Sequence, residues 1–442
     1  MNFKTLLSFR KIILASVYLF SIILISKYTM QSDFEHIYVY YSTLFLAYIL
    51  LYKILSVEEI WTFTIALIFI TFVINYNVIP NWSDDIYRYY WDGILVSSGF
   101  NPYDKLPSEL LNSGIDGITS ELYEKLNSPN YFSVYPPFAQ LFFAIATKFS
   151  SQFSGFVILL RLLYMIPFFL AAFALKGLLK RLNASANLGF LILCNPLILV
   201  EGLINLHLEM ISVSLLILFL YYIQKSTKSH WIYYYALSIA TKLNPLVLFP
   251  YLFKTILKSN PSLFLKFTLF SLLLFTGVFI NANLSHLFKS IDLYFQNFEF
   301  NASIYYILRY VGFEYSGYNL IKYIGPLLAL SSMIIITLKS YRLEDKFNFN
   351  RLLLIGTFAY FVLLIGSTIV HPWYLIPLVL FGTLVRFWPA IVWSYVIILS
   401  YHNYAGGVYH EDLRYIAIEY FLLFGSLLWW YQTRKRAQQI TR

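Results

Sequence analysis

Long apolar runs recur along the whole chain and restrict the folds that it can adopt. The runs 12–26, 37–52 and 60–79 contain no charged residue. Roughly 20 apolar residues in a helix cross a hydrocarbon core about 30 Å thick, so these runs are typical of membrane-spanning helices. With 59% hydrophobic residues among 442, the chain has more apolar surface than a soluble core can bury. We predict an all-α, polytopic membrane protein.

The predicted membrane crossings total about 12–14 helices. Those after the third run lie at 156–175, 188–200, 208–222, 231–253, 263–280, 320–338, 352–370, 373–386, 388–401 and 415–431. The run 231–253 is interrupted by Lys242-Leu243-Asn244-Pro245, which predicts a broken or re-entrant helix pair whose bend faces protein or water. No separable soluble domain is evident, so residues 1–442 are predicted to form one membrane domain.

Basic residues gather in short loops between the apolar runs, as expected for loops on the cytoplasmic side. Lys4 and Arg10 precede the first run, and Arg434-Lys435-Arg436 follows the last, which predicts that both termini are cytoplasmic. The formal net charge of +10 is therefore attributed to membrane orientation and not to nucleic-acid binding. We expect the plasma (inner) membrane of a bacterium, with the lipid bilayer as a partner.

Two longer polar segments, 80–153 and 281–318, are predicted to be external loops on the extracytoplasmic side. The first is expected to carry short helices near 84–98 and 120–126. Its apolar run 138–147 is too short to span, so it is predicted to be a juxtamembrane helix in the outer interface. The active site is expected on this side of the membrane.

The first external loop opens with a polar island at residues 81–93. Asp85, Arg88 and Asp92 would share one face of a helix, and Asp84 can also reach Arg88. One interpretation is a solvated interfacial helix whose charges pair among themselves. The other is a catalytic face held at the membrane surface. The charges alone give the two interpretations equal weight.

The predicted topology brings the unusual polar residues of other segments to the same level. Ionisable residues within apolar spans are costly and usually functional, although outer-turn positions and a helix cap are the ordinary alternatives here. These residues are Glu201, Asn205, His207 and Glu209 at one turn, His371, Trp373 and Tyr374 at another, Arg309 in the second external loop, Arg161 near the outer end of its span, and Lys242 beneath them.

Several kinds of site are disfavoured by the motifs that the sequence lacks. The single cysteine, Cys194, excludes a disulfide framework, and the spacing of His207 and Glu209 is wrong for one metal-binding helix face. We predict no metal site and no certain cofactor, with a divalent cation left open. Gly-rich nucleotide loops and a Gly-x-Ser-x-Gly motif are absent. A transferred group would therefore need a donor such as a lipid-linked sugar phosphate.

The segments 83–93 and 98–103 resemble the first-loop motif of bacterial GT-C-type mannosyltransferases, multi-span enzymes that use polyprenyl-phosphate sugars. Further similar motifs follow in order at 135–141, 195–197, 242–245, 300–306 and 371–374. The resemblance covers about residues 80–375. One departure is that the family commonly has Asn-Gly-His-Asn-Asp where this chain has Asn205-Leu206-His207-Leu208-Glu209, which leaves acceptor contacts there open.

The resemblance implies an inverting transfer in which an acidic residue of the first external loop is the general base. Asp85 is the expected base because its spacing to Arg88-Tyr89 matches the Asp-x-x-Arg-Tyr arrangement, with Asp84 as the alternative. We expect the base to lie beside Arg88, which would keep it ionised. The candidates for the donor phosphate are Arg88, Lys242, Arg309 and Arg161. The candidates for substrate binding are Asp92, Glu201, Asn205, His207, Glu209, His371, Trp373 and Tyr374.

Two other functions fit the predicted topology. A lipid-linked glycan polymerase or ligase usually has its large loop late in the chain, not after the third span. A secondary transporter or flippase would suit the broken helices near Lys242, but it does not need a long external loop rich in carboxylates. Transfer of a hexose, mannose by resemblance, from a polyprenyl-phosphate donor is favoured. The acceptor hydroxyl could belong to a glycan, a lipid or a protein.

Overall fold

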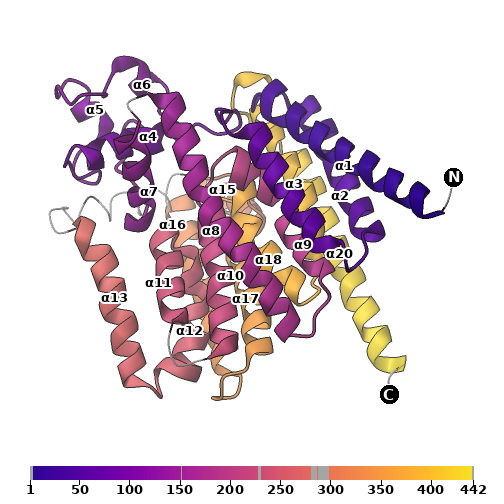
Figure 1. Cartoon of the computed structure of the whole chain (residues 1–442). Coiled ribbons are helices and arrows are strands. Elements are labelled where there is room, and N and C mark those ends of the chain that lie inside the picture. Colours follow the sequence, from indigo (N-terminus) through magenta and orange to yellow (C-terminus); the bar gives the residue numbers. More distant parts are fainter. Residues whose placement is uncertain (1–2, 151, 227–229, 280–285, 287–297, 441–442) are drawn as a thin grey trace.

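The computed structural model describes residues 3–150, 152–226, 230–279, 286 and 298–440. These residues form helices joined by turns and loops, and their only strand-like feature is an isolated bridge between Phe300 and Ile369. Most helices run side by side in one bundle (Figure 1). The predicted all-α class is confirmed.

Five helices within the described residues are long and apolar enough to span a membrane. They are α1 (Phe3–Tyr28), α2 (Phe34–Ile54), α8 (Phe153–Arg181), α16 (Ile321–Tyr341) and α20 (Leu413–Ile440). A sixth span results if α9 (Asn187–Leu193) and η1 (Ile198–Ile204), which meet at a bend of 49°, are counted as one. The chain is therefore polytopic, whereas the total of about 12–14 crossings remains a prediction that rests on shorter helices.

Shorter apolar helices complete the bundle. α10 (Glu209–Lys225) is buried along most of its length and packs against α8, α11 (Trp231–Thr241) and α18 (Ile376–Leu384). The other members of this group are α3 (Ile60–Asn75), α13 (Pro261–Phe279), α17 (Phe349–Ile365) and α19 (Pro389–Val396). A helix that is apolar all round is expected only where protein or lipid surrounds it.

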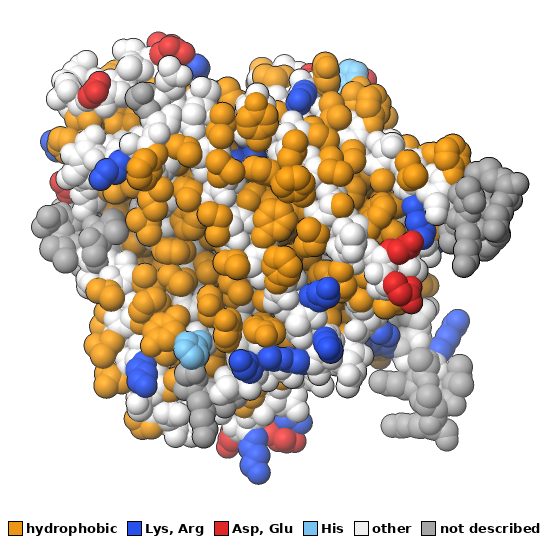
Figure 2. Space-filling view, in the orientation of Figure 1, with side chains coloured by type: hydrophobic (Ala, Val, Ile, Leu, Met, Phe, Trp, Pro, Cys, Tyr) orange, Lys and Arg blue, Asp and Glu red, His pale blue; other side chains and the backbone are white. Residues whose placement is uncertain are grey.

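A broad apolar band covers the outside of the bundle (Figure 2). Large side chains such as Leu170, Leu330 and Phe421 are exposed on α8, α16 and α20. Water would penalise so much exposed apolar surface, but lipid does not. The carboxyl ends of α8 and α10, with Arg181 and Lys225, carry basic residues beyond this band.

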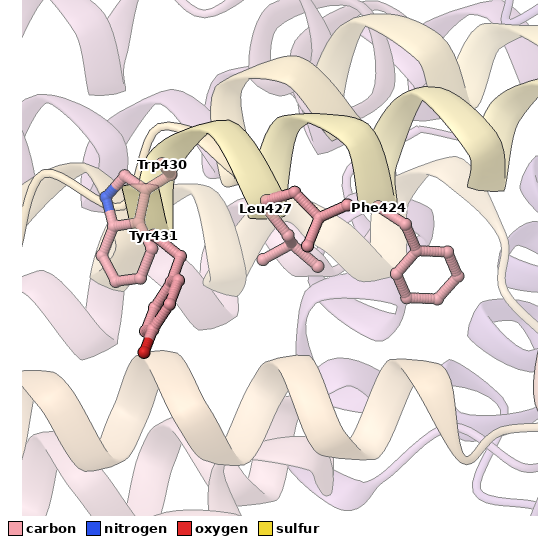
Figure 3. A pocket seen from close by; sticks show the side chains of 5 residues that line it. Phe424, Leu427, Trp430 and Tyr431 are labelled. Atoms are coloured by element: carbon pink, nitrogen blue, oxygen red, sulfur yellow. The ribbon is translucent and has the colours of Figure 1, made fainter. Parts of the chain in front are cut away.

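The face of α20 has an open apolar hollow of about 450 Å³ (Figure 3). It is lined by Phe424, Leu427, Leu428, Trp430 and Tyr431. These side chains include no charged group that could orient a sugar phosphate, and sugar sites need several placed polar groups. We therefore assign the hollow to the lipid-facing surface.

The predicted break in the run 231–253 is confirmed. α11 ends at Thr241, and the backbone of the next residue, Lys242, is extended. The chain continues through η2 (Asn244–Leu248), α12 (Phe249–Leu252) and η3 (Phe253–Leu257). The Tyr235 hydroxyl donates to the Pro245 carbonyl oxygen at 3.1 Å. A continuous helix would separate these residues by about 15 Å, so the chain folds back at Lys242.

Four short helices gather at one end of the bundle, which we call the site end (Figure 1). They are α4 (Asp85–Ser97), α5 (Pro107–Leu110), α6 (Ser120–Glu124) and α7 (Pro137–Lys148), and they include the three short helices predicted in 80–153. α7 is too short to span and packs along α4. At Gly93 an added Cβ would lie 2.7 Å from the Phe143 carbonyl oxygen, so glycine permits this close packing.

The predicted second loop, 281–318, lies partly outside the described residues, which resume at 298 before α15 (Ile304–Ser316). The Phe300 amide donates to Thr368, and the Val370 amide donates back to the Phe300 carbonyl oxygen at 2.8 Å. These bonds hold the start of the described loop beside His371.

Candidate functional site

Asp85 lies in the first turn of α4, directly after the N-terminal residue Asp84. One oxygen, Oδ1, accepts a hydrogen bond from Asn127 Nδ2 at 3.0 Å. The other, Oδ2, lies 3.8 Å from His207 Nδ1, and 23% of the Asp85 side chain is exposed. The carboxylate is thus oriented by one neighbour while its second oxygen can still be reached.

Arg88 pairs with Asp92, not with Asp85, which corrects the expectation from sequence. Its Nε donates to Asp92 Oδ1 at 2.9 Å, and Nη1 donates to the Ser128 and Tyr131 carbonyl oxygens at 3.0 Å. The local reason is that the loop after α6 offers carbonyl acceptors on the side of α4 where Asp92 lies. Arg88 is buried there and does not face the Asp85 carboxylate.

Asp92 is fully buried and all its contacts are internal. Besides Arg88, its carboxylate accepts hydrogen bonds from Ser133 Oγ at 2.5 Å and Gln140 Nε2 at 2.9 Å. Together Arg88, Asp92, Ser133 and Gln140 form what we call the Asp92 cluster, which ties α4 to α7. This geometry places Asp92 in the packing of the site end rather than on an open substrate surface.

Glu201 is a fully buried carboxylate in η1, a π-helical segment of a kind often found at functional sites. Its Oε1 accepts from the Tyr401 hydroxyl at 2.7 Å, and Oε2 accepts from Asn205 Nδ2 at 3.2 Å. His207 Nε2 lies 3.3 Å from the same Oε2. Glu201, Asn205 and His207 therefore do converge, and Tyr401 from η5 (Ile397–Gly407) completes the group.

The turn that presents His207 contains a strained residue. Leu206 has a φ of +60°, a conformation that costs a non-glycine residue about 1–2 kcal/mol. This is the position at which the resembled family commonly has glycine. The turn keeps its shape here with leucine, whose side chain is fully buried.

The second predicted turn meets His207 through ring stacking. Trp373, in η4 (Pro372–Leu375), stacks on His207 with centroids 3.6 Å apart and on His371 at 4.4 Å. Tyr374 meets His371 edge to face. Burial, followed by the charges of His207 and Lys242, lowers the pKa of His371 to about 3. His371 is therefore neutral at physiological pH.

Lys242 lies at the fold-back and joins the same region. Its ammonium is 2.9 Å from Glu209 Oε1 and 5.0 Å from the centre of the Tyr374 ring. The Lys242 side chain remains 25% exposed, whereas Glu209 is buried. Glu209 thus holds the ammonium at the site end while part of it stays accessible.

Arg309 lies in a separate ion-pair group. It donates to Glu299 at 2.7 Å and to Glu411 at 2.6 Å, and it lies over the Tyr306 ring. Desolvation lowers the pKa of Arg309, but the two carboxylates more than offset this and raise it overall. A phosphate would have to compete with both carboxylates for this guanidinium.

Arg161 is fully buried and donates to four backbone carbonyl oxygens. They belong to Tyr76, Val78, Leu203 and Ile204. These bonds join the end of α3 to the end of η1, so the geometry gives Arg161 a scaffold position beneath the site.

The structure thus brings most of the predicted residues together and leaves a few apart. Asp85, Glu201, Asn205, His207, Glu209, Lys242, His371, Trp373 and Tyr374 form one group. Asn127 and Tyr401 also belong to it but were not predicted, because one lies in a polar loop and the other in a late apolar run without a motif. Among the described residues, no three His, Cys, Asp or Glu side chains are arranged to hold a metal ion.

Comparison with known families gives one match. A family described as "Alpha-(1->6)-mannopyranosyltransferase, N-terminal domain" (MptA_B family) matches residues 17–258, more than half of the chain. The matched region contains Asp85, Glu201, His207 and Lys242, whereas Trp373 lies beyond it. Neither the curated proteins nor the solved structures give a match.

Proposed function

The chain belongs to the alpha-(1->6)-mannopyranosyltransferase family and is a membrane glycosyltransferase, and we propose that it transfers mannose from a polyprenyl-phosphate donor to an acceptor hydroxyl. The observation that supports this most is a reachable carboxylate, Asp85, beside buried polar groups and the Lys242 ammonium. Carboxylate and cation are what an inverting transfer from a sugar phosphate requires.

In the proposed reaction, Asp85 is the general base. Its carboxylate takes the proton of the acceptor hydroxyl, whose oxygen attacks the anomeric carbon from the side opposite the leaving group. The bond from that carbon to the phosphate oxygen breaks, and polyprenyl phosphate leaves with the electron pair. One attack of this kind inverts the anomeric centre.

Asp85 suits this role better than Asp84. The amide of Asn127 orients Asp85, and the other oxygen faces the site across from His207. Partial desolvation, and then the adjacent charge of Asp85, raise the pKa of Asp84. Asp84 is exposed, so it is proposed to shape the entrance.

Lys242 is the proposed partner of the donor phosphate. It is part of the same group as His207 and Trp373, it is partly exposed, and Glu209 keeps it in place. The developing charge on the leaving phosphate would draw the ammonium away from Glu209 toward the phosphate. The carboxylates around Arg309 and the carbonyls around Arg161 make these residues weaker candidates.

We propose that the site end lies on the extracytoplasmic side of the plasma membrane. Lys and Arg side chains gather at the end of the apolar band opposite the site end (Figure 2). The last turns of α8 and α10 carry Arg181 and Lys225. Basic ends of spans prefer the cytoplasm, so the site end would face outward. A lipid-linked donor can be used there without a nucleotide.

The test is an assay with purified protein and a short-chain polyprenyl-phosphate mannose. Wild type should release polyprenyl phosphate only when an acceptor is present. Asp85→Asn should lower kcat by roughly 10²–10⁴-fold, the usual contribution of a general base. Full activity in Asp85→Asn would remove Asp85 as base, and movement of the donor without bond cleavage would favour a transporter.

A further inference from the structure

A line of buried polar contacts leads from Asp85 into the protein. His207 Nδ1 lies 3.8 Å from Asp85 Oδ2, and His207 Nε2 lies 3.3 Å from Glu201 Oε2. The opposite oxygen of Glu201 accepts from the Tyr401 hydroxyl at 2.7 Å. The order carboxylate, imidazole, carboxylate therefore connects the proposed base with the interior.

Glu201 and His207 are both buried, and the ring nitrogens of His207 are not hydrogen-bonded. The His207 side chain is 1% exposed, yet neither ring nitrogen makes a hydrogen bond to a described residue. Glu201 is held by two neutral donors, from Tyr401 and Asn205. Each buried polar atom that lacks a partner costs about 1–3 kcal/mol, so this arrangement is not explained by stability.

We propose that His207 and Glu201 are positioning residues that relay the proton which Asp85 receives, an inference that rests on the proposed mannosyl transfer. Glu201 Oε2, which lies 3.3 Å from Nε2, would favour a hydrogen on that nitrogen and so leave the Nδ1 lone pair facing Asp85. A shift of about 1 Å closes the gap between Asp85 and Nδ1 to hydrogen-bond distance. Glu201 then stabilises the imidazolium that forms.

The proton balance of the step is complete. The acceptor O–H bond breaks and its proton passes to Asp85, then to His207 Nδ1, while the acceptor oxygen bonds the anomeric carbon. The electron pair of the broken sugar–phosphate bond stays on the leaving phosphate. After the product leaves, the proton returns through Asp85 to water, because 23% of that side chain is exposed.

The titratable groups around His207 come from several elements. The titratable groups that face it are Asp85 from α4, Glu201 from η1 and His371 before η4. Burial and nearby charge lower the pKa of His371, so His371 stays neutral. The Glu209–Lys242 pair adds no net charge beside them. Asp85 and Glu201 are thus the carboxylates nearest to His207, one on each ring nitrogen.

The test measures kcat, KM and their pH dependence with the purified full-length protein and short-chain polyprenyl-phosphate mannose. Glu201→Gln and His207→Gln should each lower kcat by roughly 10²-fold with little change in donor KM. The kcat of the double variant should equal that of the less active single variant, because the two residues act as one unit. In His207→Gln the acid limb of the pH profile of kcat should move down by about two pH units, the difference between the ordinary pKa values of an imidazole and a carboxylate.

A matched control is available on α20. Glu419 is also fully buried and is also held by neutral donors, Asn301 and Trp393. Glu419→Gln therefore makes the same chemical change as Glu201→Gln, at an equally buried carboxylate away from Asp85. It should leave the pH profile of kcat unchanged.

The outcomes separate this inference from the proposed function. The relay is overturned if Glu201→Gln and His207→Gln keep the wild-type kcat and an unshifted acid limb of the pH profile. It is also overturned if Glu419→Gln shifts the acid limb by the same amount as these variants. In either case, loss of transfer in Asp85→Asn leaves the proposed function standing. Absence of transfer by wild type overturns both. Should Glu201→Gln not fold, as judged by thermal unfolding in detergent, His207→Gln decides.

Discussion

The two carboxylates at either end of the Asp85–Asp92 stretch of α4 have opposite surroundings. Asp92 is fully buried, and Arg88, Ser133 and Gln140 saturate its oxygens. Asp85 has one oxygen held by Asn127 and one facing His207, with part of the side chain exposed. A saturated buried carboxylate holds elements together, whereas an unsaturated one remains free to accept a proton. Charges of the polar island do pair with one another, but as a buried pair and not on a solvated face, and catalysis at Asp85 stays a proposal.

The largest effect expected from this contrast is on stability. Asp92→Ala leaves the buried Arg88 guanidinium without its carboxylate, which should cost about 3–5 kcal/mol. Asp85→Ala removes a partly exposed side chain with one amide partner and should cost less than about 1 kcal/mol. Thermal unfolding in detergent compares the two. Equal losses of apparent Tm would erase the distinction between the carboxylates.

Lys242 and Lys254 allow a similar comparison between a residue at the site and one away from it. Lys242→Ala should raise the donor KM about tenfold, or about 1.4 kcal/mol, because one cation is lost from the proposed phosphate site. Lys254 offers a control, since it is also ion-paired, to Asp345, but lies away from the site end. Lys254→Ala should leave donor KM unchanged. Equal donor KM values for wild type and Lys242→Ala would show that another group binds the phosphate.

Sequence reasoning reached the fold class, the break at Lys242 and the helix at Asp85, because each depends on local composition. It missed the partner of Arg88. The i,i+3 and i,i+4 rules allow Arg88 to pair with Asp84, Asp85 or Asp92, and the choice is made by carbonyl oxygens of residues 128–131.

Other parts of the site depend on distant segments and could not be predicted from local pattern. Tyr401 meets Glu201 across 200 residues of sequence, and no periodicity signals such a contact. The environments of Arg161 and Arg309 were missed for the same reason, because their acceptors come from separate elements. The membrane level of these residues stays a prediction, and their partners could not be predicted from local pattern.

A smaller difference in stability is expected between two variants of Leu206, in the turn that carries His207. Leu206→Ala removes buried side-chain atoms at a cost of about 2–4 kcal/mol and keeps the unfavourable φ of +60°. Leu206→Gly removes one further carbon, Cβ, but relieves the backbone strain, so it should be about 1 kcal/mol more stable than Leu206→Ala. Apparent Tm values measured side by side test this. An alanine variant as stable as the glycine variant would mean that the turn is unstrained.

The smallest expected effect concerns Asp84. Its pKa in the folded protein is raised from 3.8, so the folded state binds this proton more tightly than the unfolded state. Wild type therefore loses stability as pH rises through the window just above 3.8, and Asp84→Asn escapes this loss. The variant should have an apparent Tm about 1 °C higher at pH 7 and no advantage below that window. Thermal unfolding of both proteins over a range of pH tests this. A gain in apparent Tm that is largest at acidic pH would contradict the predicted direction.

The contact between Tyr401 and Glu201 also has a consequence for biosynthesis. The two residues are 200 positions apart, and chain elongation adds about 5–20 residues per second. Glu201 is therefore synthesised on the order of 10–40 s before Tyr401, whose hydroxyl donates to it. A carboxylate left alone in hydrocarbon for that time would be costly, so we expect η1 to remain near the polar surface of the growing protein until η5 is inserted. The last third of the chain would then close the site by sealing this carboxylate inside.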